Sequence, residues 1–406
     1  MRILVISRIF PDCERPEYAP YNRRLYGELS KIHDVEIWGL VPFFPGQRWL
    51  DLPDRSGVPA EEVIDGLVVQ HPRVLYAPKT GRPLSGALYL ASLARRVQRN
   101  LGRSRWDAIV GSFAYPDGWA AVALARMLRV PSIVQALGSD VNVLGKDPLL
   151  APLLRWAFSQ SAAVVGPSRA LVDAAIDLGA PADTSVPIPN GVDVERFHPR
   201  DRGVCREALG HGGDDRKWIL FVGRLEEPKG IWDLLEAFER VHRERDDAHL
   251  VLVGTGVDRQ ACERRIRERG LPVTVAGVRN DVELWYGACD VFTLPSWREG
   301  TPNVVLEAMA SGRRVVTSDV GGIPVIVHDA RLGTMVPPSS PRRLADALLA
   351  ALAEPYDPQE VAQTARFGTW ADSARLLAEV LEQCVDRAER RSSSASKGSS
   401  MKRRLR

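Results

Sequence analysis

The stretch from Arg298 to Gly312 combines a loop glutamate with the signals of a helix start. Thr301 is a residue type that caps helix amino ends, Pro302 suits the first helical position, and Gly312 suits the position just past the last turn. Backbone N–H groups at such a start carry partial positive charge and bind phosphate groups. The stretch therefore predicts a helix whose amino end is an anion site suited to a diphosphate.

Two glutamates flank this predicted helix start. Glu307 lies about five residues into the helix, roughly 7 Å along its axis, close to the ribose of a nucleotide anchored by its phosphates. One carboxylate accepts from both ribose hydroxyls. Glu299, in the loop ahead of the helix, faces the side where a sugar on the diphosphate would lie. A solvated helix residue is the plainer explanation of Glu307 alone.

A second segment places two cations after an apolar strand. Residues 218–222 form the strand, a Gly-Arg turn follows, and a Pro-Lys-Gly loop opens an amphipathic helix. Arg224 and Lys229 therefore lie at a strand's carboxyl end, where ligands bind in open α/β sheets and where positive charge stabilises a departing diphosphate. Each cation alone also fits an ordinary surface charge. The joint order of strand, basic loop and glutamate-flanked helix favours a site with Arg224, Lys229 and Glu299 as catalytic residues.

The elements around these residues alternate between strands and helices. Short apolar strands at 3–6, 108–110 and 132–134 are separated by helical stretches such as 120–128, and a second series follows at 219–222, 250–253, 273–276, 291–294 and 315–317. This alternation is typical of doubly wound parallel sheets. With 406 residues and 45% hydrophobic content, the chain predicts two Rossmann-like domains at 1–190 and 200–369, a helix at 370–390 and a disordered basic tail at 391–406.

Composition excludes several classes of protein. The five cysteines are widely spaced, without a Cys-x-x-Cys or a His/Cys cluster, which argues for a reducing compartment and against structural zinc. No stretch approaches the length of a spanning helix, and the first strand is too short for a signal sequence. We expect a cytoplasmic protein with no cofactor and, at a net charge of +3, no nucleic-acid partner.

These segments, together with Pro189-Asn190-Gly191-Val192-Asp193 and Gly138-Ser139-Asp140-Val141, resemble family 4 retaining glycosyltransferases of the GT-B fold, from residue 1 to about residue 385. The resemblance implies two Rossmann-like domains facing an interdomain cleft, the first binding the acceptor and the second the nucleotide sugar. It also implies a C-terminal helix that crosses back onto the first domain, and retention of anomeric configuration. The family's pathways suggest a hexose-type sugar and a bacterial polysaccharide, cell-envelope polymer or glycolipid.

The donor site implied by this resemblance lies in the second domain. Arg279 falls where the family's base-contacting loop is expected, although a surface arginine is as good an explanation, and Gly254 would pass close to the nucleotide unless it only makes a tight turn. The sequence does not choose between UDP and GDP. The donor-binding candidates are Gly223, Gly254, Arg279, Gly300, Thr301, Pro302, Asn303 and Glu307.

On the acceptor side the chain departs from the family pattern. Residues 10–24 contain no glycine where many members have a glycine-rich loop, and Leu137 stands where many have histidine. A helix-start residue such as Asn22 is expected to substitute for the loop. Turn capping is the plainer explanation for the two aspartates among the candidates. The acceptor-side candidates are Asn22, Tyr115, Asp117, Ser139 and Asp140.

Other functions are weighed against this one. A dehydrogenase is disfavoured because the first strand is not followed by Gly-x-Gly-x-x-Gly. A non-catalytic glycan-binding or scaffold protein with the same fold is disfavoured by the intact charged residues. The sequence also lacks the Asp-x-Asp pair with which metal-using transferases bind a divalent ion, so a metal-independent reaction is expected.

The segment from Gly66 to Trp106 holds eight cations and no acidic residue. Within it Leu84, Leu88, Ala91, Ala94 and Val97 recur at helical spacing, with Arg95, Arg96, Arg99 and Arg103 largely to one side. This pattern predicts a helix lying on an anionic membrane surface, with a lipid-linked acceptor. A core-packed helix with a solvated basic face is the alternative.

Overall fold

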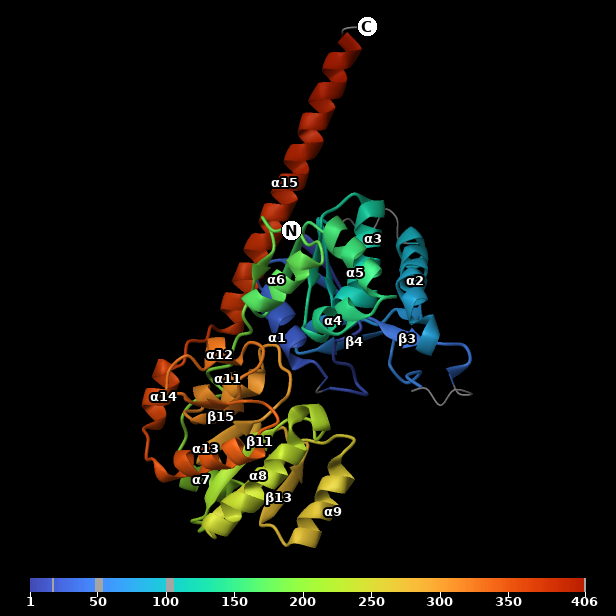
Figure 1. The fold of residues 1–406 in the computed structure, drawn as a ribbon. Coiled ribbons are helices and arrows are strands. Elements are labelled where there is room, and N and C mark those ends of the chain that lie inside the picture. The colour runs from blue at the N-terminus through green and yellow to red at the C-terminus, as the bar shows by residue number, and fades with distance from the viewer. Residues whose placement is uncertain (17, 48–53, 100–105, 405–406) are drawn as a thin grey trace. The chain divides into compact units, whose positions relative to one another are not determined.

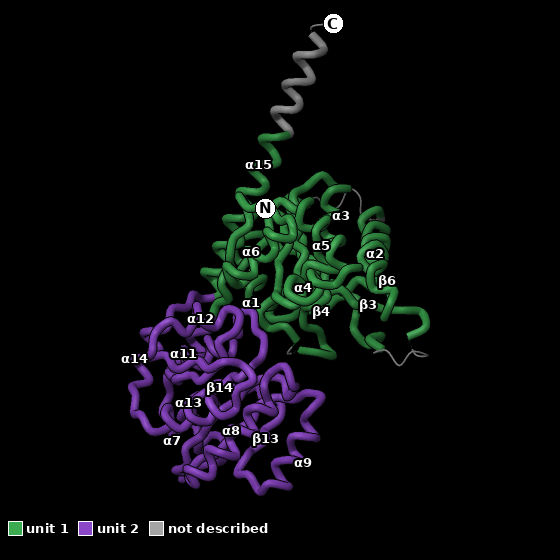
Figure 2. Tube along the Cα trace, viewed as in Figure 1, with its two compact units in different colours: residues 1–191, 370–406 green, residues 192–369 purple. Residues whose placement is uncertain are grey.

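The computed structural model describes residues 1–16, 18–47, 54–99 and 106–404, and side chains up to residue 391 except Arg99. It divides into two compact units (Figure 2). The first consists of Met1–Gly191 and Trp370–Arg406, and the second of Val192–Thr369. The strands predicted from the sequence are confirmed, with ends that differ by at most two residues.

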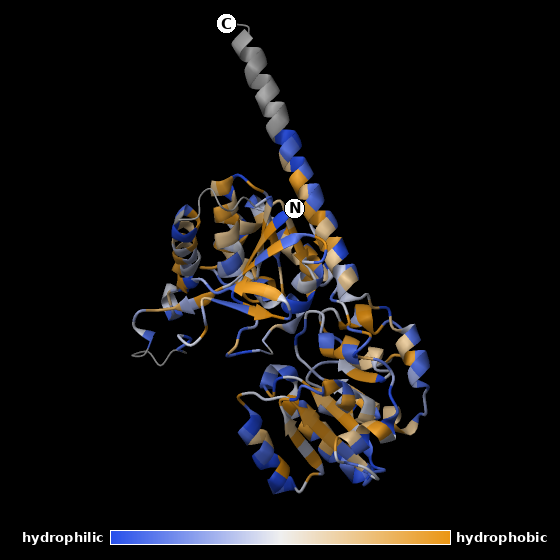
Figure 3. Ribbon diagram, turned by 180° about the vertical axis from the view of Figure 1, so that it is seen from behind, coloured by the Kyte–Doolittle hydropathy of each residue, from blue (hydrophilic) through white to orange (hydrophobic). Residues whose placement is uncertain are grey.

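The first unit is built on an eight-stranded sheet that is parallel except for one edge strand. The order is β10 (Val186–Pro187), β9 (Ala163–Gly166), β8 (Ser132–Gln135), β7 (Ala108–Ser112), β1 (Arg2–Ser7), β2 (Asp34–Gly39), β5 (Leu67–Gln70) and antiparallel β4 (Glu61–Ile64). Central strands are apolar on both faces because helices cover both (Figures 1 and 3). In β1, Ile3 and Val5 join one core, while Leu4 and Ile6 join another.

Helices cover this sheet on its two faces. α1 (Pro20–Leu29) and α15 (Trp370–Arg404) pack together over one core. The other side carries α2 (Ser85–Arg99), α3 (Trp119–Leu128), α4 (Ser139–Asn142), α5 (Ala151–Gln160) and α6 (Arg169–Asp177), with a small pair of strands β3 (Val41–Phe43) and β6 (Arg73–Leu75). Four short 3₁₀ or π turns complete the described chain: η2 (Lys79–Leu84), η3 (Ala114–Gly118), η4 (Leu144–Lys146) and, in the second unit, η5 (Glu227–Lys229).

The second unit is a six-stranded, fully parallel sheet. The order is β13 (Val273–Gly277), β12 (Ala248–Val253), β11 (Lys217–Val222), β14 (Val291–Leu294), β15 (Val315–Ser318) and β16 (Gly333–Val336). Its helices are α7 (Arg202–Ala208), α8 (Ile231–Glu244), α9 (Arg259–Arg269), α10 (Val282–Ala288), α11 (Asn303–Ala310), α12 (Ile323–Ile326), α13 (Pro341–Ala353) and α14 (Pro358–Thr364). Strand order reverses between β11 and β14, which marks the ligand-binding edge of such sheets.

The C-terminal helix α15 belongs to the first unit. Ala374, Leu377 and Leu381 pack in one core with Leu25 and Leu29 of α1. The backbone continues as helix to Arg404, where the sequence predicted disorder from residue 391. The difference has a physical reason, since extending an established helix adds one hydrogen bond for each residue fixed, without a new nucleation step.

The basic helix α2 packs into the core rather than standing apart from it. Its buried residues are Tyr89, Leu93 and Val97, a spacing of four residues. The predicted apolar face is therefore wrong for Leu84, which precedes the helix and is 62% exposed, and for exposed Ala91. The bulkier side chains took the core positions, in agreement with the core-packed alternative.

The cations of α2 are also partly used within the unit. Arg96 donates to Gln70 and lies over the Trp38 ring, whereas Arg95 is exposed. The predicted cation Arg103 and the side chain of Arg99 lie outside what the structure describes. Across the described ranges, we find no helix with the combined length and apolar character that a membrane span needs.

Candidate functional site

The candidate site surrounds the point where strand order reverses in the second sheet. β11 and β14 are neighbours there, and the loops that follow them carry the predicted cations and the predicted glutamate. Because the strands are parallel, both loops leave the sheet at its carboxyl edge. The topology thus brings Lys229 and Glu299 together, although they lie seventy positions apart in the sequence.

Lys229 and Glu299 form an ion pair at this edge. The Lys229 Nζ atom donates to Glu299 Oε1 at 2.6 Å, with the two side chains 23% and 8% exposed. Removing a carboxylate from water costs free energy, and a hydrogen-bonded cation beside it offsets part of that cost. The ion pair is therefore already formed in this structure. The lysine is its more exposed member.

Two hydrogen bonds from Trp297 hold the loop after β14 onto the start of α8. The Trp297 backbone N–H donates to the Pro228 carbonyl at 3.0 Å, and its indole N–H donates to Asp233 at 2.7 Å. Lys229 lies between Pro228 and Asp233 in the chain, and Glu299 follows Trp297 by two residues. The loop carrying the glutamate is thereby fixed to the turn carrying the lysine.

A third loop, after β15, supports the glutamate from the other side. The Gly322 N–H donates to the Gly300 carbonyl at 2.7 Å. Gly321 has φ +59°, and a Cβ there would lie 1.9 Å from the Glu299 carbonyl oxygen. No side chain fits at that position. Sequence reasoning missed this support, although two adjacent glycines in the loop after a predicted strand were the available signal.

Helix α11 begins later than the sequence predicted. It spans Asn303–Ala310, so Pro302 precedes the first helical residue and Thr301 is not its cap, which corrects both assignments. Pro302 itself has extended backbone angles, and a residue before proline is kept out of the helical region, which moves the start past both residues. Gly312 lies just past the end in the left-handed region, as predicted.

Glu307 is half-buried on α11 and has a neighbour that the sequence did not reveal. The hydroxyl of Tyr286, on α10, lies 3.2 Å from a Glu307 carboxylate oxygen and 3.1 Å from the Val304 carbonyl. Burial, reinforced by the Glu307 charge, raises the Tyr286 pKa well above its usual value. The tyrosine therefore remains a hydrogen-bond donor that orients the carboxylate.

Gly223, which follows β11, and Gly254, which follows β12, form a close backbone contact. Gly254 has φ +132°, and a Cβ there would lie 1.9 Å from the Gly223 carbonyl oxygen. The two loops can pack together only because residue 254 has no side chain. Arg224, just after Gly223, reaches outward, with its side chain 70% exposed and 3.0 Å from Glu226.

Arg279 is engaged on the surface of the second unit. Its guanidinium makes two hydrogen bonds to Asp281, at 2.9 and 2.6 Å, and lies over the Trp285 ring. This geometry agrees with the alternative that Arg279 is a surface arginine. A base-contacting role would require the arginine to leave this pair.

Asp140 in the first unit is an internal cap. Its fully buried carboxylate accepts from the backbone N–H groups of Ala114, Leu137, Gly138 and Val141, at 2.8 to 3.2 Å. Burial raises its pKa, and these four amides oppose that shift. Turn capping thus accounts for this aspartate. Its neighbour Ser139, at the start of α4, is exposed.

Asp117 is buried beneath Arg8. It accepts from the Arg8 backbone N–H at 2.9 Å and lies 3.2 Å from the guanidinium Nε, which sits over the Phe113 ring. Burial raises the Asp117 pKa to about 7, and Arg8 opposes this shift. Arg8 follows β1 and Phe113 follows β7, where strand order reverses in the first sheet. The sequence missed Arg8, although a cation directly after the first strand was visible.

Asn22 and Tyr115 also use their polar groups within the unit. Buried Asn22 donates to the Ile9 carbonyl at 2.6 Å and to Ser112 at 3.1 Å. The Tyr115 hydroxyl accepts from the Gly86 N–H at 3.0 Å and donates to the Pro83 carbonyl at 2.6 Å. Four of the five acceptor-side candidates therefore hold loops in place, because each is buried where only an internal partner satisfies it.

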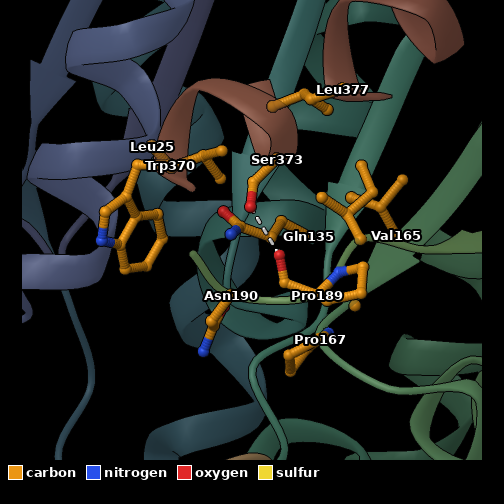
Figure 4. A pocket seen from close by; sticks show the side chains of 11 residues that line it. Leu25, Gln135, Val165, Pro167, Pro189, Asn190, Trp370, Ser373 and Leu377 are labelled. Atoms are coloured by element: carbon orange, nitrogen blue, oxygen red, sulfur yellow. Dashed lines mark hydrogen bonds between the residues drawn. The ribbon is translucent and has the colours of Figure 1, made fainter. Parts of the chain in front are cut away.

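A small cavity lies near the carboxyl ends of β8 and β9, where the chain leaves and re-enters the first unit (Figure 4). Ser373 donates to the Pro189 carbonyl at 2.6 Å across it, and Trp370 and Asn190 line its side. Its volume of about 10 Å³ accommodates no more than about one water molecule. A sugar acceptor does not fit inside it.

Within the described ranges, no group of three or more His, Cys, Asp or Glu side chains is arranged to hold a metal ion. The candidate site consists instead of a lysine–glutamate pair, an exposed arginine and the amino end of α11.

Comparison with known proteins identifies the family. A model described as "Glycosyl transferases group 1" matches residues 216–354, and one described as "Glycosyl transferase 4-like domain" matches residues 18–191. The putative teichuronic acid biosynthesis glycosyltransferase TuaC of Bacillus subtilis is 30% identical over 366 residues, which is 86% of this chain and 88% of the relative. A GDP-mannose-dependent alpha-(1-6)-phosphatidylinositol monomannoside mannosyltransferase of Mycolicibacterium smegmatis is 25% identical, with 87% and 90% covered.

Solved structures agree on the fold. Sucrose-phosphate synthase from Thermosynechococcus elongatus superposes with a TM-score of 0.73 at 21% identity, covering 94% of this chain and 98% of its own. Anabaena Alr3699/HepE in complex with UDP gives 0.65 at 20% identity, covering 97% and 100%. These structures have the GT-B fold, which is thus confirmed for this chain. The chain belongs to the family 4 glycosyltransferases.

Proposed function

We propose that this glycosyltransferase moves a hexose-type sugar from a nucleoside-diphosphate sugar to a glycan or lipid-linked acceptor, with retention, in polysaccharide or cell-envelope biosynthesis. The observation that carries the proposal is the Lys229–Glu299 pair beside the start of α11. Relatives support the donor class, since HepE has been solved with UDP-glucose and the mycobacterial relative is named as GDP-mannose-dependent. Both nucleotides therefore remain donor candidates.

In the proposed reaction each group has a defined task. Lys229, Arg224 and the first amides of α11 stabilise the negative charge that grows on the diphosphate as its bond to the sugar breaks. The acceptor hydroxyl attacks from the face that the diphosphate leaves, its oxygen forms the new bond, and its proton passes to the departing phosphate oxygen. Glu299, held by Lys229, binds the sugar, and Glu307, oriented by Tyr286, binds the ribose.

Nucleotide binding tests the donor site. At a hundred times its Kd, UDP or GDP should stabilise the wild-type protein by about 2.7 kcal/mol in a thermal-shift measurement. Glu307→Ala should lose most of this stabilisation because the ribose hydroxyls lose their acceptor, and Glu307→Gln should lose less. Tyr286→Phe removes the hydroxyl that orients Glu307 and should weaken nucleotide binding by less than Glu307→Ala. An unchanged Kd in Glu307→Ala would refute the ribose assignment.

Metal independence belongs to the same proposal. Lys229 and Arg224 supply the positive charge that a divalent ion supplies in other transferases. Sugar transfer by purified protein should therefore continue at its full rate in EDTA. Loss of activity that magnesium or manganese restores would reverse this part of the proposal. Absence of both sugar transfer and donor hydrolysis with every donor tried would favour a non-catalytic glycan-binding or scaffold protein.

The proposed location is an anionic membrane surface on the cytoplasmic side. Exposed Lys79 and Arg82 lie close in the chain to exposed Leu84 before the start of α2, exposed Arg95 lies farther along the same helix, and each cation near such a surface contributes about 1 kcal/mol. Wild-type protein should sediment with phosphatidylglycerol vesicles at low salt, and Arg82→Ser/Arg95→Ser should sediment less. Equal sedimentation of both proteins would contradict this use of α2.

A further inference from the structure

A groove of about 600 Å³ lies at the amino edge of the first sheet, opposite to the edge at which α/β sheets usually bind ligands. Ser132 at the start of β8, Ala162 just before β9 and Thr184 before β10 form part of its wall. We call it the arginine groove, because four arginines line it: Arg126, Arg129, Arg387 and Arg391.

The arginines come from two separate parts of the chain. Arg126 and Arg129 are at the end of α3, and the other two are on α15, more than two hundred residues later. They line one groove because α15 packs back onto the first unit, where it contacts β9 (Figure 1). Their convergence is therefore a property of the fold.

Two of these four arginines are without an ion pair among the described residues. Several surface arginines in the second unit pair with an aspartate two positions away, as in Asp214/Arg216, Arg245/Asp247, Arg279/Asp281 and Asp329/Arg331. In contrast, the described residues give neither Arg129 nor Arg387 an ion pair. Arg126 donates to the neutral amide of Gln160.

The charge balance of the groove is positive. Among the described residues of its lining, Asp183 is the one that is acidic. The carboxyl ends of α3 and α5 also lie there, and each contributes about half a negative charge. Asp183 and the two helix ends together contribute about two negative charges, and the four arginines contribute four positive charges. The net charge of the groove is therefore roughly +2. The Ser161 and Thr184 hydroxyls donate to carbonyls, and Arg129 and Arg387 have no ion pair among the described residues, so these two guanidinium groups are the main candidates to bind a ligand.

We propose that the arginine groove binds a phosphate-bearing ligand with about two negative charges. A phosphate monoester carries about that charge at neutral pH, and the planar fork of arginine matches its oxygens two at a time. The volume is that of a small-molecule site. The phosphate comes from a soluble phosphorylated compound or from the headgroup of an anionic lipid, and the two sources share the same chemistry.

Inorganic pyrophosphate is the first probe, measured by isothermal titration calorimetry on the full chain. Wild-type protein should bind it at two sites, the groove and the proposed donor site. Arg129→Gln/Arg387→Gln should lose the groove site, with a Kd raised about tenfold or more. Lys229→Ala should lose only the other site, so failure of the proposed function is distinguishable from failure of the groove.

Arg264→Gln/Arg343→Gln is the matched control, because both arginines are exposed and also lack a described ion pair, but lie in the second unit on α9 and α13. It should bind pyrophosphate like the wild type. Arg129→Lys/Arg387→Lys should recover part of the affinity, since the charge returns without the fork. If the far-ultraviolet circular dichroism spectrum of Arg129→Gln/Arg387→Gln differs from that of the wild type, its fold has changed. The pyrophosphate affinity of Arg129→Lys/Arg387→Lys, which should lie below that of the wild type, then tests the proposal.

The second probe separates the two sources of phosphate. Vesicles of phosphatidylcholine with and without phosphatidic acid are compared, because phosphatidic acid presents a phosphate monoester. Loss of phosphatidic-acid binding in Arg129→Gln/Arg387→Gln would assign the groove to a lipid headgroup. Loss of pyrophosphate binding alone would assign it to a soluble ligand. Unchanged binding of both probes by this variant would overturn the proposal.

Discussion

Replacing Lys229 by alanine is expected to lower kcat/KM by about a hundredfold or more, the scale of losing one contact to transition-state charge. The effect is expected mainly in kcat, because the charge on the diphosphate grows only as the bond to the sugar breaks. Steady-state kinetics with a saturating acceptor measures it. Arg224→Ala should act in the same direction, since its exposed side chain reaches the same edge of the sheet.

The Lys229→Ala variant also breaks the ion pair with Glu299, which can lower the stability of the fold. Lys229→Ala leaves Glu299, only 8% exposed, without its cation, and an unpaired buried charge destabilises a fold. Lys229→Ala/Glu299→Gln removes both charges and should regain thermal stability without regaining activity. Lys31→Ala, which breaks an exposed pair with Glu28 at 2.7 Å, is the matched control and should change neither property. Wild-type activity in Lys229→Ala would remove the role proposed for this lysine.

Gly321→Ala is expected to lower kcat by about a hundredfold, although residue 321 contributes no chemical group. Its Cβ would lie 1.9 Å from the Glu299 carbonyl oxygen, so the backbone carrying Glu299 must move, and a shift of about 1 Å at a catalytic group costs about that much. Nucleotide binding at α11 should change less. Kinetics together with the nucleotide Kd measures both effects.

Gly270→Ala separates the effect of the contact from the effect of the backbone angle. Gly270 has φ +62°, close to the +59° of Gly321, but a Cβ there would meet nothing within 4 Å. Both variants therefore carry the same cost of a left-handed alanine, about 1 kcal/mol of stability. Gly270→Ala should keep full activity. Equal activity loss in both variants would mean that backbone strain, rather than displacement of Glu299, is responsible.

The sequence predicts the architecture well because the architecture depends on local patterns. Apolar runs determine the strands, and Lys229 and Glu299 lie in the loops that follow two of them, while the roles of both residues stay predictions. Parallel strands that share a carboxyl edge then bring these residues together without any long-range information. Tyr286, Gly321 and Trp297 were not predicted as partners because their roles arise from contacts between loops that are distant in sequence.

The acceptor side shows the opposite situation. Asp140 and Asp117 were selected as polar residues at strand ends and Asn22 as a residue at a helix start, and each is buried and hydrogen-bonded internally. Polar residue type and position do not distinguish a group that faces a ligand from one that satisfies backbone amides, since both occur at the same strand ends. Only the direction of the side chain separates them, and that direction depends on the packed loop.

Because α15 belongs to the first unit but follows the second unit in the chain, it affects how this protein folds during its synthesis on the ribosome. Residues 192–369 form a continuous unit that can close as soon as it emerges, whereas the first unit lacks α15 until the chain has passed Trp370. At typical synthesis rates, the intervening stretch takes roughly 10 to 40 s to translate. During that interval Leu25, Leu29 and Ile188, which share a core with α15, have no cover. We therefore expect the first unit of the nascent chain to be most accessible to chaperones and proteases while residues 192–369 are being translated.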